Sequence, residues 1–172
     1  PPNPSELLGS KQMAALTSTQ VAALDTADIA RLSSMQVAAL SASGVGGLST
    51  RQLAVLSVDQ AEALNSNQIG ALTSSQLAAL GTDDIATFST KEISAIGSGA
   101  ISGLSTSTIA SLSSEKIVAI STAGISGMTT RQVDALSAGQ IAILSTKQMA
   151  ALTSLRVSVL ETTDIAALSS SQ

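Results

Sequence analysis

The chain has 172 residues, of which 44% are hydrophobic and only 12% are charged, and Phe88 is its one aromatic residue. These proportions exclude charge-driven disorder and require a core built from Ile, Val, Leu and Ala. The lack of Cys and His excludes disulfides, thiolate chemistry and the commonest general base and zinc ligand, while a net charge of -4 with eight Lys and Arg argues against a nucleic-acid partner.

The N-terminal stretch "PPNP", residues 1–4, predicts an extended, Pro-rich lead-in, because proline disfavours helix in the residue before it. The first ten residues, "PPNPSELLGS", lack the basic start and the apolar stretch of a signal peptide. No apolar run in the chain approaches the ~20 residues that cross a membrane. We therefore predict no signal peptide and no membrane span in this sequence.

An eight-residue repeat fills the chain from residue 5 to residue 172. Leu16, Leu24 and Leu32 belong to a series of apolar residues that returns every eight positions and holds to Leu168 without an insertion. Numbered from Ser5, the 21 octads share the consensus Ile or Val, small, Ala, Leu, Ser or Thr, Ser or Thr, variable, and Gln or Asp, and the eighth position is Gln, Asp or Glu in 15 of them. We predict a single solenoid over residues 5–172, because units this short are stable only when they stack.

The boundary between octads carries a helix-start signal, as "LSTKQM" from Leu144 to Met149 illustrates. Ser145 can cap a helix, and Gln148, three residues later, can reach back to the backbone N–H of the cap, which makes a capping box. Leu144 and Met149 then stand where a hydrophobic staple forms. Because the pattern recurs in one register, each octad is predicted to start a new helix of about two turns, or ~10 Å.

Two other arrangements are open to this pattern. One long helix fits poorly, because eight residues advance ~800° and the apolar stripe would drift by ~80° per octad. A β-solenoid is the stronger alternative, since an even period keeps strand faces constant. However, Ile and Leu three positions apart share a helical face but not a strand face, and Ala and Gln favour helix. The predicted fold is an all-α solenoid, with a β-solenoid as the alternative.

The number of octads in each turn of the solenoid is left open by the sequence. If two octads made a turn, helices spaced by 8–10 Å would give a rod roughly 80–100 Å long. The seventh position should face water, because it collects eight of the charged residues: Lys11, Arg51, Asp59, Asp83, Lys91, Glu115, Arg131 and Lys147.

Three octads depart from the pattern in the same way. "VGGL", "ISGL" and "ISGM" carry Gly in place of Ala, and Gly44, Ala100 and Gly124 replace the box residue before them. We interpret these changes as drift in a tolerant array, with helices weakened by about 1 kcal/mol for each Ala-to-Gly change. A built-in bend is the alternative.

The few acidic clusters are interpreted as structural. They are Asp25 with Asp28, Asp83 with Asp84, and Glu161 with Asp164, and three of these acids occupy the capping-box position, where a negative charge favours a helix N-terminus. No catalytic, cofactor-binding or metal-ligating residue is assigned, and the chain is not expected to be an enzyme. The sixth position, Ser or Thr in 18 of 21 octads, could form a hydroxyl ladder for ice or a glycan.

The stretches "LTSTQVAAL" from Leu16, "LTSSQLAAL" from Leu72 and "LSTKQMAAL" from Leu144 resemble the "LTTxQIxAL" octapeptide arrays of very large secreted or surface proteins of bacteria. The resemblance implies an extracellular or cell-surface setting and brings no catalytic residues. The leading hypothesis is a structural module, either a spacer or a self-associating subunit of a filament, sheath or adhesin. The alternative is a module that binds a glycan, a protein or ice.

Overall fold

A computed structural model describes residues 8–172, so the predicted lead-in at residues 1–4 lies outside the described residues; side chains at positions 154 and 155 are also left undescribed. Within 8–172 the octads form short helices and no β-strand is present. The predicted all-α solenoid is therefore confirmed, and the β-solenoid alternative is wrong.

Three octads make one turn of the solenoid. Helix α1 (Ser10–Ala15) packs on α4 (Ser34–Ala39), which packs on α7 (Val58–Glu62), so that packed helices begin 24 residues apart. All the main helix–helix contacts follow this offset. Helices stacked at 8–10 Å give a rod of roughly 56–70 Å for seven turns, shorter than two octads per turn would give.

The helices stand in three columns, which form the three sides of the rod. The first column continues from α1, α4 and α7 with α10 (Thr82–Thr87), α12 (Thr106–Ser111), α15 (Thr130–Asp134) and α18 (Ser154–Val157). The second column contains α2 (Ser18–Ala22), α5 (Ala42–Gly46), α8 (Ser66–Gly70), α11 (Thr90–Ala95), α13 (Ser114–Ala119), α16 (Ala138–Ala142) and α19 (Thr162–Ala167). The third column contains α3 (Thr26–Arg31), α6 (Thr50–Leu53), α9 (Ser74–Ala79), the 3₁₀ helix η2 (Ile101–Gly103), α14 (Thr122–Gly127) and α17 (Thr146–Ala150).

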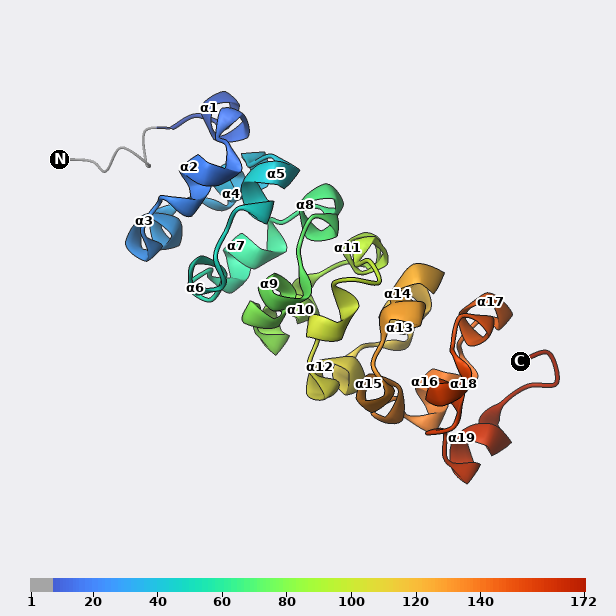
Figure 1. The fold of residues 1–172 in the computed structure, drawn as a ribbon. Helices are drawn as coiled ribbons and strands as arrows, with labels where there is room; N and C mark the ends of the chain where they lie inside the picture. The colour runs from blue at the N-terminus through green and yellow to red at the C-terminus, as the bar shows by residue number, and fades with distance from the viewer. Residues whose placement is uncertain (1–7) are drawn as a thin grey trace.

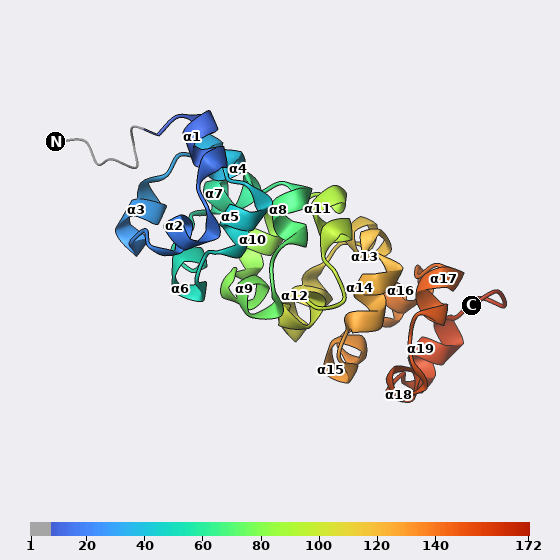
Figure 2. The same cartoon turned by 45° about the horizontal axis from the view of Figure 1, so that its top comes forward.

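The solenoid is an elongated rod whose described ends lie far apart. Figure 1 shows the helices following one another from α1 at one end to α19 at the other, and the turned view in Figure 2 shows the same extended shape. A helix contacts mainly the helices one turn before and one turn after it. The rod is thus built from contacts between neighbouring turns, as in other solenoids.

Each helix is short because its two ends are marked in the sequence. Helix α4 ends at Leu40, whose φ of -58° and ψ of 140° leave the helical region. The next residue, Ser41, is also extended and begins the capping of α5. The two extended residues at this boundary redirect the chain, and this redirection forms the corner between two sides of the rod.

The core is a single column of aliphatic side chains along the axis of the rod. The first and fourth positions of the octads supply it, so that each turn adds six apolar side chains. Phe88 occupies a fourth position, is 1% exposed and fits into the core in place of Leu. No turn could bury its own apolar residues alone, because helices this short are unstable in isolation.

Burial at the first position should dominate the stability of a helix. Ile93 in α11 is fully buried, whereas Ile165 in α19 occupies the same octad position and column but is 50% exposed. We expect Ile93→Ala to lower the free energy of unfolding by about 2–5 kcal/mol, because a cavity replaces the side chain. Ile165→Ala should cost clearly less, and equal costs in urea unfolding would contradict a core that runs along the axis.

Candidate functional site

The predicted capping boxes form at most octad boundaries. At the boundary used as the example, the backbone N–H of Ser145 donates to Gln148 Oε1 at 2.9 Å, and the backbone N–H of Gln148 donates to Ser145 Oγ at 3.2 Å. Gln148 is nevertheless 3% exposed, far more buried than a capping residue on a surface helix needs to be. A second set of contacts explains this burial.

The glutamine amide also binds the preceding turn of the solenoid. Gln52 Nε2 donates to Val21 O at 2.9 Å and to Leu24 O at 2.8 Å. These carbonyls lie at the C-terminal end of α2, where a helix has no partners of its own for its last C=O groups. The side chain of Gln52 thus joins the N-terminus of α6 to the C-terminus of a helix one turn earlier.

We call this arrangement the glutamine bridge. In it, Oε1 accepts from the N-cap and Nε2 donates to carbonyls 28 to 31 residues earlier, at nitrogen–oxygen distances of 2.6 to 3.5 Å. The described glutamines that donate in this way are Gln36, Gln52, Gln60, Gln68, Gln76, Gln132, Gln140, Gln148 and Gln172. Burying an amide costs free energy unless its hydrogen bonds are made, and the bridge makes them on both sides of the amide.

Two basic side chains substitute for the bridging glutamine. Lys116 Nζ donates to Ala86 O at 2.5 Å, and Arg156 Nε donates to Met128 O. Lys and Arg can only donate, so they reproduce the contact with the preceding turn but not the acceptor of the capping box. The sequence pattern, which was interpreted through the box alone, did not reveal this contact with the preceding turn.

The acidic residues at the eighth position accept hydrogen bonds from the N-cap, whereas Lys116 and Arg156 donate to the preceding turn. These contacts support the structural interpretation of the acidic residues. Asp84 Oδ2 accepts from the backbone N–H of Gly81 at 2.9 Å, and Asp164 Oδ2 accepts from that of Glu161 at 2.9 Å. Asp25, the N-cap of α3, accepts from the backbone N–H of Asp28 at 2.7 Å. An ionised carboxylate accepts but does not donate, so it completes the cap and supplies no bridge.

Glycine at the third position permits a second kind of contact between turns. A Cβ built at Gly103 would overlap the backbone of Ser74 in the preceding turn. Cβ atoms at Gly47 and Gly127 would likewise overlap the backbones of Ser18 and Ser98. In each case the octad just before the glycine ends in Gly or Ala, at Gly44, Ala100 or Gly124, instead of a bridging residue. The interpretation as drift is therefore wrong for the third position of these octads, because a Cβ there would overlap the backbone of the preceding turn and only Gly fits.

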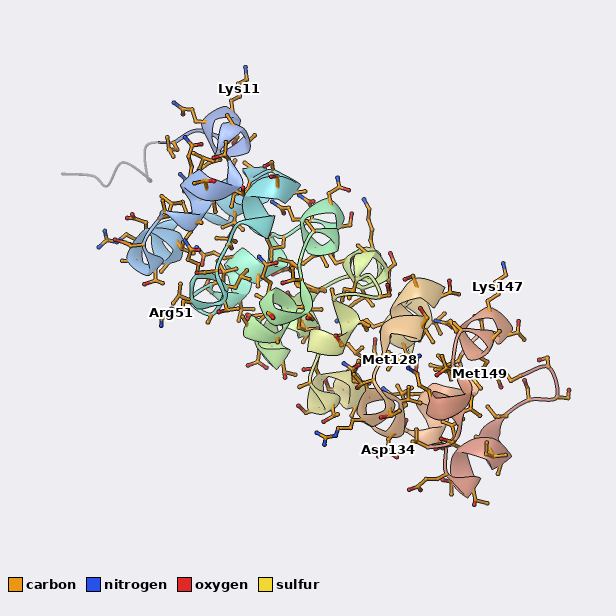
Figure 3. All side chains as sticks on the ribbon, viewed as in Figure 1. Lys11, Arg51, Met128, Asp134, Lys147 and Met149 are labelled. Carbon is orange, nitrogen blue, oxygen red and sulfur yellow. The ribbon has the colours of Figure 1, made fainter. Side chains whose placement is uncertain are left out.

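The second, fifth, sixth and seventh positions form most of the exposed surface. Figure 3 shows Lys11, Arg51 and Lys147 projecting away from the rod, as predicted for the seventh position, and all three are exposed. Met128 lies in the core at 0% exposure, and Met149 packs partly buried against it.

The hydroxyl groups of the sixth position do not form one ladder. Because a turn contains three octads, they are distributed over the three columns, and neighbours in a column are one turn apart. Some of them are used internally: Ser34 Oγ donates to Asp59 O at 3.2 Å.

No group of three or more potential metal-ligating residues is found among residues 8–172 outside the side chains left undescribed. In the same part of the chain, no helix is long and apolar enough to cross a membrane.

The three-sided stack and the bridges between its turns define a helical tandem-repeat solenoid. The ALTTAQ repeat family matches the chain at residues 21–58, 45–74, 77–114, 109–146 and 117–154, and each match begins at the first position of an octad. Since these matches cover more than half of the sequence, the chain belongs to the ALTTAQ repeat family. A search of curated proteins finds no match.

Removing the donor of one bridge should destabilise the rod. Gln60→Glu keeps the shape of the side chain but leaves Ile29 O and Leu32 O without the amide that reaches them at 2.9 and 2.6 Å. We expect a loss of about 1–3 kcal/mol in the free energy of unfolding, measured in urea at neutral pH. The control is Gln12→Glu, at the same octad position but exposed, which should change stability by less than about 0.5 kcal/mol.

The reverse change tests the same bridge by adding a donor. The carboxylate of Glu92 caps α11 by accepting from the backbone N–H of Ser89 at 2.8 Å. Glu92→Gln would add an amide N–H at the position from which glutamines in other octads donate to carbonyls of the preceding turn. The variant should gain about 0.5–1.5 kcal/mol. The exposed Glu115→Gln is its control, and equal effects of the two changes would show that charge, not the bridge, governs stability.

The close contact of glycine predicts opposite effects for two Gly→Ala variants. At Gly70 a Cβ would lie 3.5 Å from Ala95 O, an ordinary contact, so Gly70→Ala should stabilise α8 by about 0.5–1 kcal/mol. At Gly103 the Cβ would overlap Ser74, and Gly103→Ala should destabilise the rod by about 1–3 kcal/mol. Thermal unfolding of the two variants checks the signs, and a stabilised Gly103→Ala would contradict close packing there.

Proposed function

We propose that this chain is a non-enzymatic structural rod that acts as a spacer or as a self-associating segment of an extracellular filament, sheath or adhesin. The observation that supports the proposal is the glutamine bridge, which ties successive turns together along most of the rod. Because the same hydrogen bonds join each turn to the next, the length of the rod depends on the number of octads, and the rod resists separation of its turns.

The proposed setting is the exterior of a bacterial cell. The support for it is the resemblance of the octads to arrays in large secreted and surface proteins. Low charge is compatible with lateral association, because a net charge of -4 over 172 residues gives weak mutual repulsion. We therefore propose a second copy of the rod as the first partner to test.

A binding module is the alternative, favoured by the exposed Ser and Thr residues of the sixth position. In one column these hydroxyls recur once per turn, which is roughly 8–10 Å for packed helices. A regular row of hydroxyls at this spacing could meet a repeating surface such as a polysaccharide or ice.

Negative-stain electron microscopy of the purified chain over a concentration series tests the proposal. We expect rods of uniform width, and a variant in which residues 58–81 are duplicated should be longer by one turn, roughly 8–10 Å. Ordered filaments that grow with concentration would support self-association.

Two outcomes would contradict parts of the proposal. Rods of unchanged length in the duplicated variant would contradict a spacer whose length follows the number of octads. Single rods at every concentration would contradict self-association by this segment, and binding assays with polysaccharides and ice would then test the alternative.

A further inference from the structure

One corner of the rod contains a cavity where the glutamine bridge is missing. Thr108 occupies the bridging position of α12, and its hydroxyl contacts Thr82 of the preceding turn but makes no hydrogen bond with the carbonyls that a bridging glutamine would reach. In the octads with glutamine, the equivalent carbonyls are occupied: Leu48 O, for example, accepts from Gln76 Nε2 at 2.8 Å. Leu77 O and Leu80 O, the corresponding acceptors for Thr108, receive no side-chain donor from the described residues.

The space left by the missing amide is enclosed by two turns. Its volume is about 230 Å³, and it is lined by the end of α9, the start of α10, the end of η2 and the start of α12. Figure 1 shows α9, α10 and α12 together in the middle of the rod. Because a water molecule takes up about 30 Å³ of liquid, the cavity has room for a small organic group.

The polar groups of the cavity wall are mainly acceptors. Thr108, only 4% exposed, shares hydrogen bonds with Thr82 Oγ1 at 3.0 Å and with Ser105 Oγ at 2.8 Å. Leu77 O accepts only the backbone N–H of Leu80, at 3.2 Å, and thus keeps a free lone pair on the wall. A complementary ligand must therefore supply N–H donors.

The chain shows which donors fit such carbonyls. Glutamine amides occupy them at most corners, and at another corner the ammonium of Lys116 binds Ala86 O at 2.5 Å. At the cavity, Asp84 Oδ2 accepts from the backbone N–H of the wall residue Gly81 at 2.9 Å, so that a carboxylate lies next to the wall. This charge favours a cationic donor over a neutral amide.

We propose that the cavity binds a primary ammonium group, carried by a small alkylamine or by a lysine side chain of a partner. The ammonium would donate to Leu77 O and Leu80 O, as the glutamine amide does elsewhere, and to the hydroxyl oxygen of Thr108. This site is independent of the rod's proposed role as a spacer.

NMR titration of the ¹⁵N-labelled chain at constant ionic strength tests the proposal. Ethylammonium chloride should shift the amide signals of Gly81, Thr82 and Ser105 in a saturable manner. Tetramethylammonium, which has the same charge but no N–H donor, should not. N-acetyl-lysine methylamide distinguishes the two sources, since its binding would show that the cavity is open to a partner's lysine, and ethylammonium binding alone would assign a closed site for free amines.

Thr108→Gln supplies the missing amide from the chain itself. The variant restores the residue found in the bridging octads, so it should fold with a raised melting temperature and bind ethylammonium at least ten-fold more weakly. Ser75→Gln, an exposed change one turn earlier, should leave binding unchanged.

Three results would overturn the assignment. They are the absence of saturable shifts, equal shifts with tetramethylammonium, and unchanged ethylammonium binding in a folded Thr108→Gln variant. Tighter binding of acetamide than of ethylammonium would overturn the preference for a cation.

Discussion

The stacking of turns in this protein depends on the primary amide of the eighth-position glutamine. The amide has an acceptor and a donor at opposite ends, and the structure uses both: Gln52 Oε1 accepts from Ser49 N at 2.8 Å, while Gln52 Nε2 donates to two carbonyls of the preceding turn. One side chain thereby satisfies the start of one helix and the end of another. This exchange repeats along most of the rod and gives the short helices partners for backbone groups at both of their ends.

The substitutions at this position show what the amide contributes. Lys116 and Arg156 retain only its donor, and Glu92 retains only its acceptor. Where Gly or Ala stands at the eighth position, glycine at the following third position lets the backbones of two turns approach directly, as at Gly103 against Ser74. The rod therefore has two kinds of junction between turns, and glycine at the third position of an octad follows a Gly or Ala at the eighth position of the octad before it.

The junctions are not distributed evenly, and this bears on function. From Asp84 to Thr108, four successive octads show no side-chain donor to the carbonyls of the preceding turn among the described residues. Glutamine bridges follow one another before this segment, up to Gln76, and again from Gln132 onwards. The stability of a solenoid is approximately a sum of contributions from each turn and from each contact between neighbouring turns. It is therefore locally lower where the hydrogen bonds between two turns are missing. The middle of the rod thus differs from its flanks in stability, and it also contains the cavity at Thr108.

The sequence by itself determined the period, the helical type, the capping boxes and the buried and exposed positions. These are local properties: hydrophobic spacing and cap chemistry act within about one octad. The cap is recognised in "LSTKQM", and the period in the recurrence of that stretch. Only the tertiary structure decided that three octads make a turn, that Gln148 bonds Ile120 O at 2.8 Å, and that Gly103 is required by Ser74. Each of these depends on which residues meet across 24 to 31 positions of the chain. An exact octad repeat leaves that offset open, because every octad presents the same faces to any neighbour.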